Sequence, residues 1–419
     1  MRALAAEAHA AARRLAGASR EQKDAALRAA AGLLLEPQTQ ERLFAANKQD
    51  LEVGRRKGLS APLLDRLRLD AGTLVRLAEG LRQVVSLADP VGAVISETVR
   101  PNGLRLRQVR VPLGTILIIF ESRPNVTIEA GSLCLKSGNA CILRGGGEAT
   151  NSNLALAEVL RAALKTAGLP EAAVSVPSVS GHAAVRELLK LDGLIDLVIP
   201  RGGEGLIRAV ARQSRIPVIK HYQGVCHVYL DRTADPEMAR RIVLNAKLQR
   251  PATCNAAETL LVHRELAPAV LPALARELAA QGCELVCEPR AKALLASAGL
   301  TNIRKADAET FHTEYLDKVL SVAVVGSLEE AVEHIERFGS RHTEAIVTGD
   351  AEAGRRFQQS VDSSSVFVNA STRLSDGFEY GLGAEIGIST DKLHARGPMG
   401  LESLTTYKWL GDGAGQLRE

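Results

Sequence analysis

The sequence predicts an α/β protein with two α/β domains on parallel sheets, together with a β-hairpin and an irregular C-terminal tail. Three observations support this class. Strand-like apolar runs alternate with helix-like segments from residue 114 onward, a second alternating series begins near Asp231, and 419 residues are too many for one compact core. Such alternation calls for right-handed crossovers, which place helices on both faces of each sheet.

The composition is that of an ordinary globular protein, with 46% hydrophobic and 24% charged residues. A net charge of +4 and 3% aromatic residues give little support for nucleic-acid binding, so we expect none. No apolar run approaches the roughly 20 residues of a membrane helix, and we expect no membrane partner. Six cysteines in so long a chain favour a reducing compartment over a disulfide framework. Cys283 and Cys287 lack a second cysteine pair or a histidine cluster, so we predict no metal site.

The N-terminal part is helical by its pattern. Residues 2–88 are rich in Ala, Leu, Arg and Glu at helical spacing and predict several helices. The first 17 residues faintly resemble a transit peptide, but Glu7 interrupts them and the helical pattern continues past residue 20. We therefore predict the first helix of the mature fold, in a cytoplasmic protein.

Alternation replaces helical spacing at residues 93–112. The turn Pro101-Asn102-Gly103 between two strand-like arms predicts a β-hairpin, and its second arm carries Arg105, Arg107 and Arg110, which suits an exposed or intersubunit ribbon.

The first α/β series follows this hairpin. We predict strands at residues 114–120, 140–144, 174–179, 194–200 and 216–221, with helices at 127–137, 151–167, 183–191 and 204–214 between them. Gly138 is a C-cap candidate for the helix before it, and Asn151 and Ser152 are N-cap candidates for the helix that they open.

The second series contains the predicted helices 235–248, 265–281, 328–338 and 351–361 and the predicted strands 258–263, 283–287, 318–325, 344–349 and 365–370. The glycine-rich tail from Asp376 ends in a strand-like run at 402–410, which we expect to lie across another surface of the protein.

Cys254 is the candidate nucleophile. Most other cysteines sit in or beside apolar runs, whereas Cys254 lies in a polar loop after Arg250 and Pro251, and Pro251 ends the preceding helix. The alternative is a free loop cysteine without a role.

Two glycine-rich turns each follow a strand and lead toward a helix, where free N–H groups favour phosphate. They contain Arg144, Gly145 and Gly146 in one turn and Arg201, Gly202, Gly203 and Glu204 in the other. Neither is a GxGxxG fingerprint, and singly each glycine turn is more often structural, but on adjacent units of one sheet they fit a dinucleotide site. Arg144 suits a ribose 2′-phosphate, and glycines occupy the three positions between Arg144 and Glu148, so no acidic side chain is available there; this favours NADP over NAD. The alternative is a solvent-facing arginine.

Asn125 offers an amide donor that could stabilise an oxyanion, although such a residue is more often a helix cap. His221, Tyr222 and His227 surround a third glycine turn, which ends at a strand, and lone histidines there are more often structural than catalytic.

Taken together, these residues resemble the aldehyde dehydrogenase superfamily and, within it, the gamma-glutamyl phosphate reductases (glutamate-5-semialdehyde dehydrogenases) of proline biosynthesis. The likeness spans essentially the whole chain and includes VPLGTILIIFESRPNVT, GNACILRGGGEATNSN, RIPVIKHYQGVCHVYLD, QRPATCNAAETLLVH, FGSRHTEAIVTGD, SSSVFVNASTRLSDGFEYGLGAEIGIST and HARGPMGLESLTTYKW.

The resemblance implies three parts. Residues 1–92 and 113–230 would form an NADP-binding domain, residues 231–372 a catalytic domain that holds Cys254, and residues 93–112 with 373–419 an oligomerisation unit. It also implies a homo-oligomer and a functional association with glutamate 5-kinase, the source of the substrate.

The resemblance further implies a reaction. Cys254 would attack the acyl phosphate of L-glutamyl 5-phosphate, release phosphate and form a thioester, which NADPH would reduce to glutamate 5-semialdehyde. Asn125 and the Cys254 N–H would hold the oxyanion, Arg144 would face the adenosine ribose, and residues 201–204 would lie near the cofactor. Glu314 resembles the glutamate that binds the nicotinamide ribose. For the substrate's α-amino and α-carboxylate groups, Ser122, Arg123 and Arg396 are the candidates.

One departure concerns mechanism. Hydrolytic aldehyde dehydrogenases hold a glutamate base in the turn that corresponds to HYQGVCHV, but residues 218–230 contain no Asp or Glu. Water would then be poorly activated, which favours exchange with phosphate over hydrolysis. A CoA-acylating aldehyde dehydrogenase, a non-redox cysteine hydrolase and a catalytically silent NADP-binding protein are the alternatives.

Overall fold

The computed structural model of the chain describes residues 1–179 and 181–418. It consists of two compact units. The first unit contains Met1–Lys220, Leu382–Gly387 and Met399–Glu419, and the second contains His221–Gly381 and Ile388–Pro398. Each unit has its own parallel sheet with helices on both faces, so the predicted α/β class with two parallel sheets is confirmed.

The first unit opens with helices, as the helical spacing of residues 2–88 predicts: α1 (Arg2–Leu15), α2 (Arg20–Leu33), α3 (Pro37–Arg56), α4 (Ala61–Leu67) and α5 (Ala71–Ser86). Ser19 and Gln22 form a capping box at the start of α2, which satisfies N–H groups that a helix start leaves unpaired.

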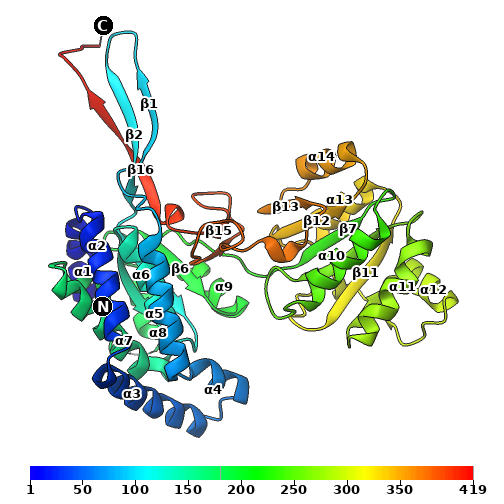
Figure 1. The fold of residues 1–419 in the computed structure, drawn as a ribbon, viewed down its shortest axis with the longest axis horizontal. Helices are drawn as coiled ribbons and strands as arrows, with labels where there is room; N and C mark the ends of the chain where they lie inside the picture. Colours follow the sequence, from blue (N-terminus) through cyan, green and yellow to red (C-terminus); the bar gives the residue numbers. More distant parts are fainter. Residues whose placement is uncertain (180, 419) are drawn as a thin grey trace. The chain divides into compact units, whose positions relative to one another are not determined.

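The sheet of the first unit has the order β5-β4-β3-β6. Its strands are β3 (Thr115–Phe120), β4 (Ala140–Arg144), β5 (Val174–Ser175) and β6 (Leu197–Arg201), and its helices are α6 (Val126–Lys136), α7 (Thr150–Thr166), α8 (His182–Leu188) and α9 (Glu204–Gln213). Apolar residues of α1, α8 and α9 pack on one face, and α6 contacts the other through Gly131, which lies against Leu143 (Figure 1). Residues 216–221, predicted as a strand, make only a single parallel bridge, between Val218 and Val198.

Two other details of this unit differ from the prediction. Asn151 and Ser152 do not cap α7 with their side chains, because the Asp50 carboxylate of α3 accepts their backbone N–H groups, at 3.2 and 2.7 Å. Asn125 stands at the N-cap position of α6 but also makes no side-chain cap bond; its amide donates to Glu129 at 2.9 Å.

A three-stranded antiparallel sheet of order β1-β2-β16 also belongs to the first unit. The predicted hairpin forms β1 (Val94–Val99) and β2 (Arg105–Pro112), and the strand predicted in the tail forms β16 (Thr405–Asp412), which pairs with β2 along its whole length. Arg107 pairs with Asp412 and Arg110 with Glu402, so two of the hairpin's arginines bind the tail.

The second unit has a seven-stranded parallel sheet of order β10-β9-β11-β8-β7-β12-β13. Its strands are β7 (Cys226–Leu230), β8 (Ala257–His263), β9 (Glu284–Cys287), β10 (Arg304–Lys305), β11 (Val319–Val325), β12 (Thr343–Val347) and β13 (Ser365–Val368). Because β7 pairs with β8 and β12, the change of unit lies at residues 220–221 and not at the 230–231 boundary expected from the sequence.

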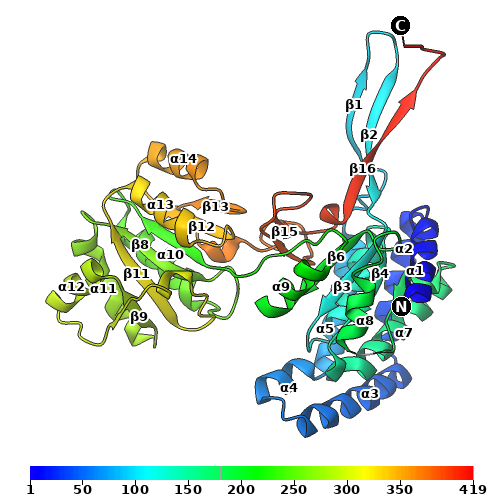
Figure 2. The same cartoon turned by 180° about the vertical axis from the view of Figure 1, so that it is seen from behind.

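Helices cover both faces of this second sheet, as Figures 1 and 2 show from opposite sides. One face packs against α10 (Pro236–Leu248), α11 (Ala267–Ala280) and α12 (Pro289–Ser297), and the other packs against α13 (Leu328–Phe338) and α14 (Ala351–Ser360). The tail contains a two-stranded sheet of β14 (Gly387–Ser389) and β15 (Gly397–Met399). Among the residues that the structure describes, no helix has the length and apolar character needed to cross a bilayer.

Candidate active site

Cys254 lies in the loop between α10 and β8 and is partly exposed, whereas the other five cysteines are buried. Burial raises the thiol pKa of Cys283 to about 11 and that of Cys287 to about 12, and it also raises the pKa of Cys226. A buried, protonated thiol is a poor nucleophile. Cys254 is therefore the cysteine of this chain best placed to react.

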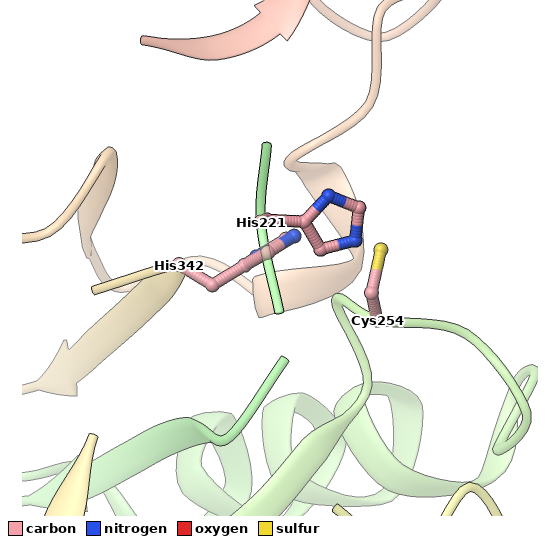
Figure 3. A group of neighbouring side chains, drawn as sticks. All are labelled: His221, Cys254 and His342. Atoms are coloured by element: carbon pink, nitrogen blue, oxygen red, sulfur yellow. The ribbon is translucent and has the colours of Figure 1, made fainter. Parts of the chain in front are cut away.

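Three adjacent strands bring two histidines to Cys254. The neighbours β8, β7 and β12 run parallel, so all three begin at the same edge of the sheet. Cys254, His221 and His342 each precede one of these strands by a few residues. Their sulfur and ring nitrogens consequently gather within 4.8 Å of one another (Figure 3).

The main chain of residue 224 packs directly on that of Cys254. A Cβ atom on Gly224 would stand 1.8 Å from the Cys254 carbonyl oxygen, so only glycine fits there. The Cys226 thiol donates to the same oxygen at 3.2 Å, and the Gly224 N–H donates to Glu314 Oε1 at 2.9 Å. These contacts fix the loop that carries the thiol and bring Glu314 beside it.

The two histidines differ in their surroundings. His221 Nδ1 lies 3.0 Å from the Ile388 carbonyl oxygen, and a carbonyl can only accept, so Nδ1 carries the proton and Nε2 has the lone pair. His342 is fully buried, and burial, with a smaller contribution from His221, lowers its pKa to about 3. His342 is thus neutral at physiological pH.

A buried ion pair closes the Cys254 loop at its base. Lys247, near the end of α10, holds the Glu258 carboxylate of β8 at 2.7 Å, and both side chains are fully buried. Burial raises the pKa of Glu258 to about 7, while the Lys247 ammonium opposes that rise. The pair links the two ends of the loop and so restrains the position of Cys254.

Arg373 places a positive charge close to the thiol. Its guanidinium donates to Asn255 and to Gln249, which hold it beside the Cys254 loop. Burial and the nearby Arg250 lower the pKa of Arg373, whereas the charges of Asp376 and, to a smaller extent, Cys254 and Cys226 raise it. A cation near a thiol is one of the surroundings that activate a nucleophilic cysteine.

The first unit contains the candidate cofactor residues. A pocket at the ends of β4 and β5 is lined by Leu143, Arg144, Gly145, Gly146, Thr150, Asn153, Val176, Pro177 and Val179. The Arg144 guanidinium donates to the Gly145 and Gly181 carbonyl oxygens there. The nearby Glu148 carboxylate instead accepts from the Ser122 N–H and hydroxyl, at 3.0 and 2.6 Å.

In the second predicted phosphate turn, residues 201–204, a carboxylate of the protein already binds the main chain. The Gly203 N–H at the start of α9 donates to Glu121 Oε2 at 2.9 Å, and Glu121 also lies against Gly202. Glu204 pairs with Arg208 of the same helix. An incoming phosphate would have to displace the Glu121 carboxylate from this turn.

Comparison with known proteins agrees with these features. The model of the aldehyde dehydrogenase family matches residues 1–283. A gamma-glutamyl phosphate reductase from Anaeromyxobacter sp. (strain K) is 53% identical over 418 residues, which cover 100% of this chain and 97% of the relative. The chain belongs to the gamma-glutamyl phosphate reductases of the aldehyde dehydrogenase family. The resemblance inferred from the sequence is therefore confirmed, and the chain is an oxidoreductase.

Two further family members support the assignment. The gamma-glutamyl phosphate reductase of Opitutus terrae is 55% identical over 377 residues, 90% of this chain and 88% of the relative. The crystal structure of gamma-glutamyl phosphate reductase from Thermotoga maritima matches with a TM-score of 0.96 at 40% identity and covers 99% of both chains. The fold inferred from the sequence is thus that of a solved family member.

The predicted site residues of this gamma-glutamyl phosphate reductase family member fall into two sets. Cys254, Glu314 and Arg396 lie in the second unit, whereas Asn125 and the other candidate cofactor residues lie in the first. Two substrate candidates are engaged elsewhere, since Ser122 binds Glu148 and Arg396 binds Asp362. In the first unit, burial and the charges of Arg66 and Arg201 lower the pKa of Arg123, whereas the carboxylates of Glu129 and Glu121 raise it.

Sequence reasoning missed the roles open to His221, His342 and Arg373. These residues are far apart in the sequence, and they come close together only because β8, β7 and β12 are neighbours in the sheet. The signal available was that His221, Cys254 and His342 each stand just before a strand-like run.

Proposed function

We propose that this enzyme catalyses the NADPH-dependent reduction of L-glutamyl 5-phosphate to L-glutamate 5-semialdehyde and phosphate in proline biosynthesis, through a thioester on Cys254. The observation that carries the proposal is the partly exposed Cys254 thiol beside His221 and Arg373, in a chain whose full-length relatives are gamma-glutamyl phosphate reductases.

His221 accepts the proton of the Cys254 thiol. Nδ1 is bound to the Ile388 carbonyl, so Nε2 is the nitrogen that would accept the proton within the cluster that contains the sulfur. The thiolate then attacks the acyl carbon, a C–S bond forms, and the C–O bond to phosphate breaks. Phosphate leaves as an anion and needs no proton, so His221 stays protonated beside the sulfur.

The first unit would hold the cofactor. The pocket presents the Arg144 guanidinium, while the Glu148 carboxylate is bound to Ser122 and is not among the lining residues. The Arg144 guanidinium suits the 2′-phosphate of NADP, although the Glu148 carboxylate lies against Gly146 and would have to turn away from it. Gly145 and Gly146 let the main chain approach the nucleotide, and Arg201 with residues 202–204 would lie beside it. When bound, NADPH supplies the hydride that reduces the thioester.

Other side chains would hold the reacting groups. Asn125 and the Cys254 N–H would stabilise the oxyanion. For this, the Asn125 amide must break its hydrogen bond to Glu129. Glu314, already bonded to Gly224 beside the thiol, would bind the nicotinamide ribose. Of the three substrate candidates we favour Arg123, because Ser122 and Arg396 bind Glu148 and Asp362 while Arg66 and Arg201 add positive charge near Arg123.

We assign the three-stranded sheet to homo-oligomerisation. Val94, Val99, Tyr407 and Trp409 on its strands are each more than half exposed, which is unusual for apolar side chains and typical of an interface. The first unit is then the cofactor domain and the second the catalytic domain, in a cytoplasmic enzyme. A kinase that phosphorylates glutamate must supply its substrate, which suggests association with glutamate 5-kinase.

A steady-state assay tests the function. Glutamate 5-semialdehyde is supplied with NADP while phosphate and CoA are varied. We expect NADPH to form only with phosphate, and Cys254→Ser to abolish its formation. Turnover that needs CoA in place of phosphate would identify a CoA-acylating enzyme, and activity retained by Cys254→Ser would refute the thioester.

Two variants test the assigned side chains. We expect His221→Gln to lower kcat by about 100-fold or more, the usual contribution of a general base, and to slow alkylation of Cys254 by iodoacetamide. His182→Gln, which replaces an exposed histidine on α8, is the matched control and should change neither rate.

Arg144→Ala should raise the KM for NADP more than the KM for NAD. Arg161→Ala breaks the exposed ion pair with Glu158 on α7 and should leave both KM values unchanged. Equal use of NAD and NADP by the unmodified enzyme would remove the role of Arg144.

A further inference from the structure

We infer that His221, Cys254 and His342 together form a binding site for a zinc ion, which would inhibit the enzyme reversibly by occupying its nucleophile. The inference concerns a ligand outside the proposed reaction, and its test does not require turnover.

The geometry is that of a small cation site. One ligand atom from each of the three residues lies within 4.8 Å of the other two. Figure 3 shows the Cys254 sulfur and the His342 ring directed toward His221 from different segments of the chain. Zinc bonds of about 2.0–2.3 Å place ligand atoms a little closer together than this, so modest side-chain rotation completes the site.

The donor set is also specific. Two imidazoles and a thiolate bind Zn²⁺ well, whereas Mg²⁺ and Ca²⁺ prefer the oxygen ligands that this cluster lacks. Three protein ligands leave a fourth tetrahedral position for water or for an anion.

The buried His342 ring provides an independent observation. Its Nε2 atom is fully buried and has no hydrogen-bond partner within residues 1–179 and 181–418. Buried polar atoms are nearly always paired, since leaving one unpaired is costly. A metal ion bound to the Nε2 lone pair would satisfy it.

Both rings are oriented as metal-ligating histidines usually are. Such a histidine typically bonds its second nitrogen to a protein oxygen, which fixes the ring and its tautomer. His221 Nδ1 contacts the Ile388 carbonyl oxygen at 3.0 Å, and His342 Nδ1 contacts Thr343 Oγ1 at 2.8 Å. In the His342 ring, this contact leaves Nε2 as the nitrogen that faces a metal ion.

Binding would block catalysis without any redox change. The Cys254 S–H bond breaks, a Zn–S bond forms, and the proton passes to the solvent. The nucleophile is then masked until a chelator removes the ion.

Direct binding measurements test the site. The purified full-length enzyme is titrated with Zn²⁺ against a chromophoric chelator, and with Co²⁺, whose thiolate complex absorbs light. We expect one ion per chain, protection of Cys254 from iodoacetamide, and loss of activity that EDTA restores. The cobalt–thiolate absorption should be absent in Cys254→Ser.

Two histidine variants test the ligand set. His342→Gln should weaken Zn²⁺ binding by at least about 100-fold, because loss of even an outer-shell partner costs up to that much. His182→Gln, which removes an exposed histidine, should bind Zn²⁺ like the unmodified enzyme.

The inference is overturned if Zn²⁺ binds equally well to His342→Gln, or if it binds without protecting Cys254. If His342→Gln does not fold, the protection assay and the cobalt spectra of the unmodified enzyme and Cys254→Ser decide the matter. A reductase insensitive to Zn²⁺ would contradict only this inference, whereas a chain that binds Zn²⁺ but does not reduce its substrate would contradict only the proposed function.

Discussion

Replacement of Gly224 by alanine tests how closely the thiol loop is held. The added Cβ atom would stand 1.8 Å from the Cys254 carbonyl oxygen and 2.7 Å from its Cα, and an ordinary contact is about 3.5 Å. Both partners are main-chain atoms, so no side-chain rotation relieves the overlap. The two segments must therefore separate by roughly 1.5 Å, which moves the Cys254 main chain away from His221.

The expected consequences follow from that displacement. A 1 Å misplacement of a reacting group costs about 100-fold in rate, so Gly224→Ala should lower kcat at least that much. Overpacking of this kind destabilises by about 1–3 kcal/mol, and the variant should still fold. Steady-state kinetics, iodoacetamide alkylation of Cys254 and thermal unfolding measure the three quantities.

Gly32→Ala is the matched control. Gly32 lies in the exposed face of α2 with nothing within 4 Å of the added atom, so the change should raise stability by about 0.5–1 kcal/mol and leave kcat unchanged. A folded Gly224→Ala variant with kcat within roughly twofold of the unmodified enzyme, about 0.4 kcal/mol in barrier, would refute the reasoning.

Three further predictions concern stability. Lys247→Met should lower the free energy of unfolding by about 3–5 kcal/mol, because it removes the cation that pairs with the buried Glu258 carboxylate. The double variant that also carries Glu258→Gln should recover part of this loss when both are measured by chemical denaturation. A loss below about 1 kcal/mol in the single variant would contradict the role of the pair. Burial lowers the pKa of His334 to about 3, so the unfolded chain binds more protons below the usual value of 6.5 and stability is lost as the pH falls from there toward 3. Acidification from pH 7 to pH 5 should lower the free energy of unfolding by about 2 kcal/mol through this group. His334→Phe retains an aromatic ring between Phe311 and Phe338 and should remove that part of the pH dependence. If the free energy of unfolding of this variant depended on pH as in the unmodified enzyme, the reasoning would be wrong. Asp50→Ala should destabilise the first unit by about 0.5–2 kcal/mol, because the N–H groups at the start of α7 lose their acceptor, whereas an unaltered melting temperature would show that water replaces the carboxylate without cost.

The elements of the fold were largely predictable, because most strands of the two sheets are local apolar runs; the exception β10 consists of the exposed Arg304 and Lys305 and was not predicted. The helix predicted at 328–338 coincides with α13, and the strand predicted at 140–144 coincides with β4. Helix α12 was not predicted. Residues 216–221 read as a strand from their apolar character, but only Val218 finds a partner in the sheet.

Contacts between distant parts of the chain were not predictable in the same way. Asp50 binds the start of α7 from 101 residues away, a relation that no local pattern indicates. The active-site cluster also depends on contacts between distant parts of the chain. Cys254 could be selected because it stands alone in a polar loop, but His342 joins it only because β8, β7 and β12 are neighbours in the sheet. The position of these residues at the amino ends of the strands also departs from the usual placement of ligand sites at the carboxyl ends.

A single-turnover experiment without phosphate tests the central claim, the thioester on Cys254, most directly. The enzyme is mixed with glutamate 5-semialdehyde and NADP in a phosphate-free buffer, NADPH is followed by its absorbance, and the protein is then analysed by mass spectrometry. The account predicts a burst of one NADPH per active site, a mass gain of one glutamyl group on Cys254, and resumed turnover when phosphate is added. Continuous NADPH formation without phosphate, or a burst with no mass gain on Cys254, would contradict it.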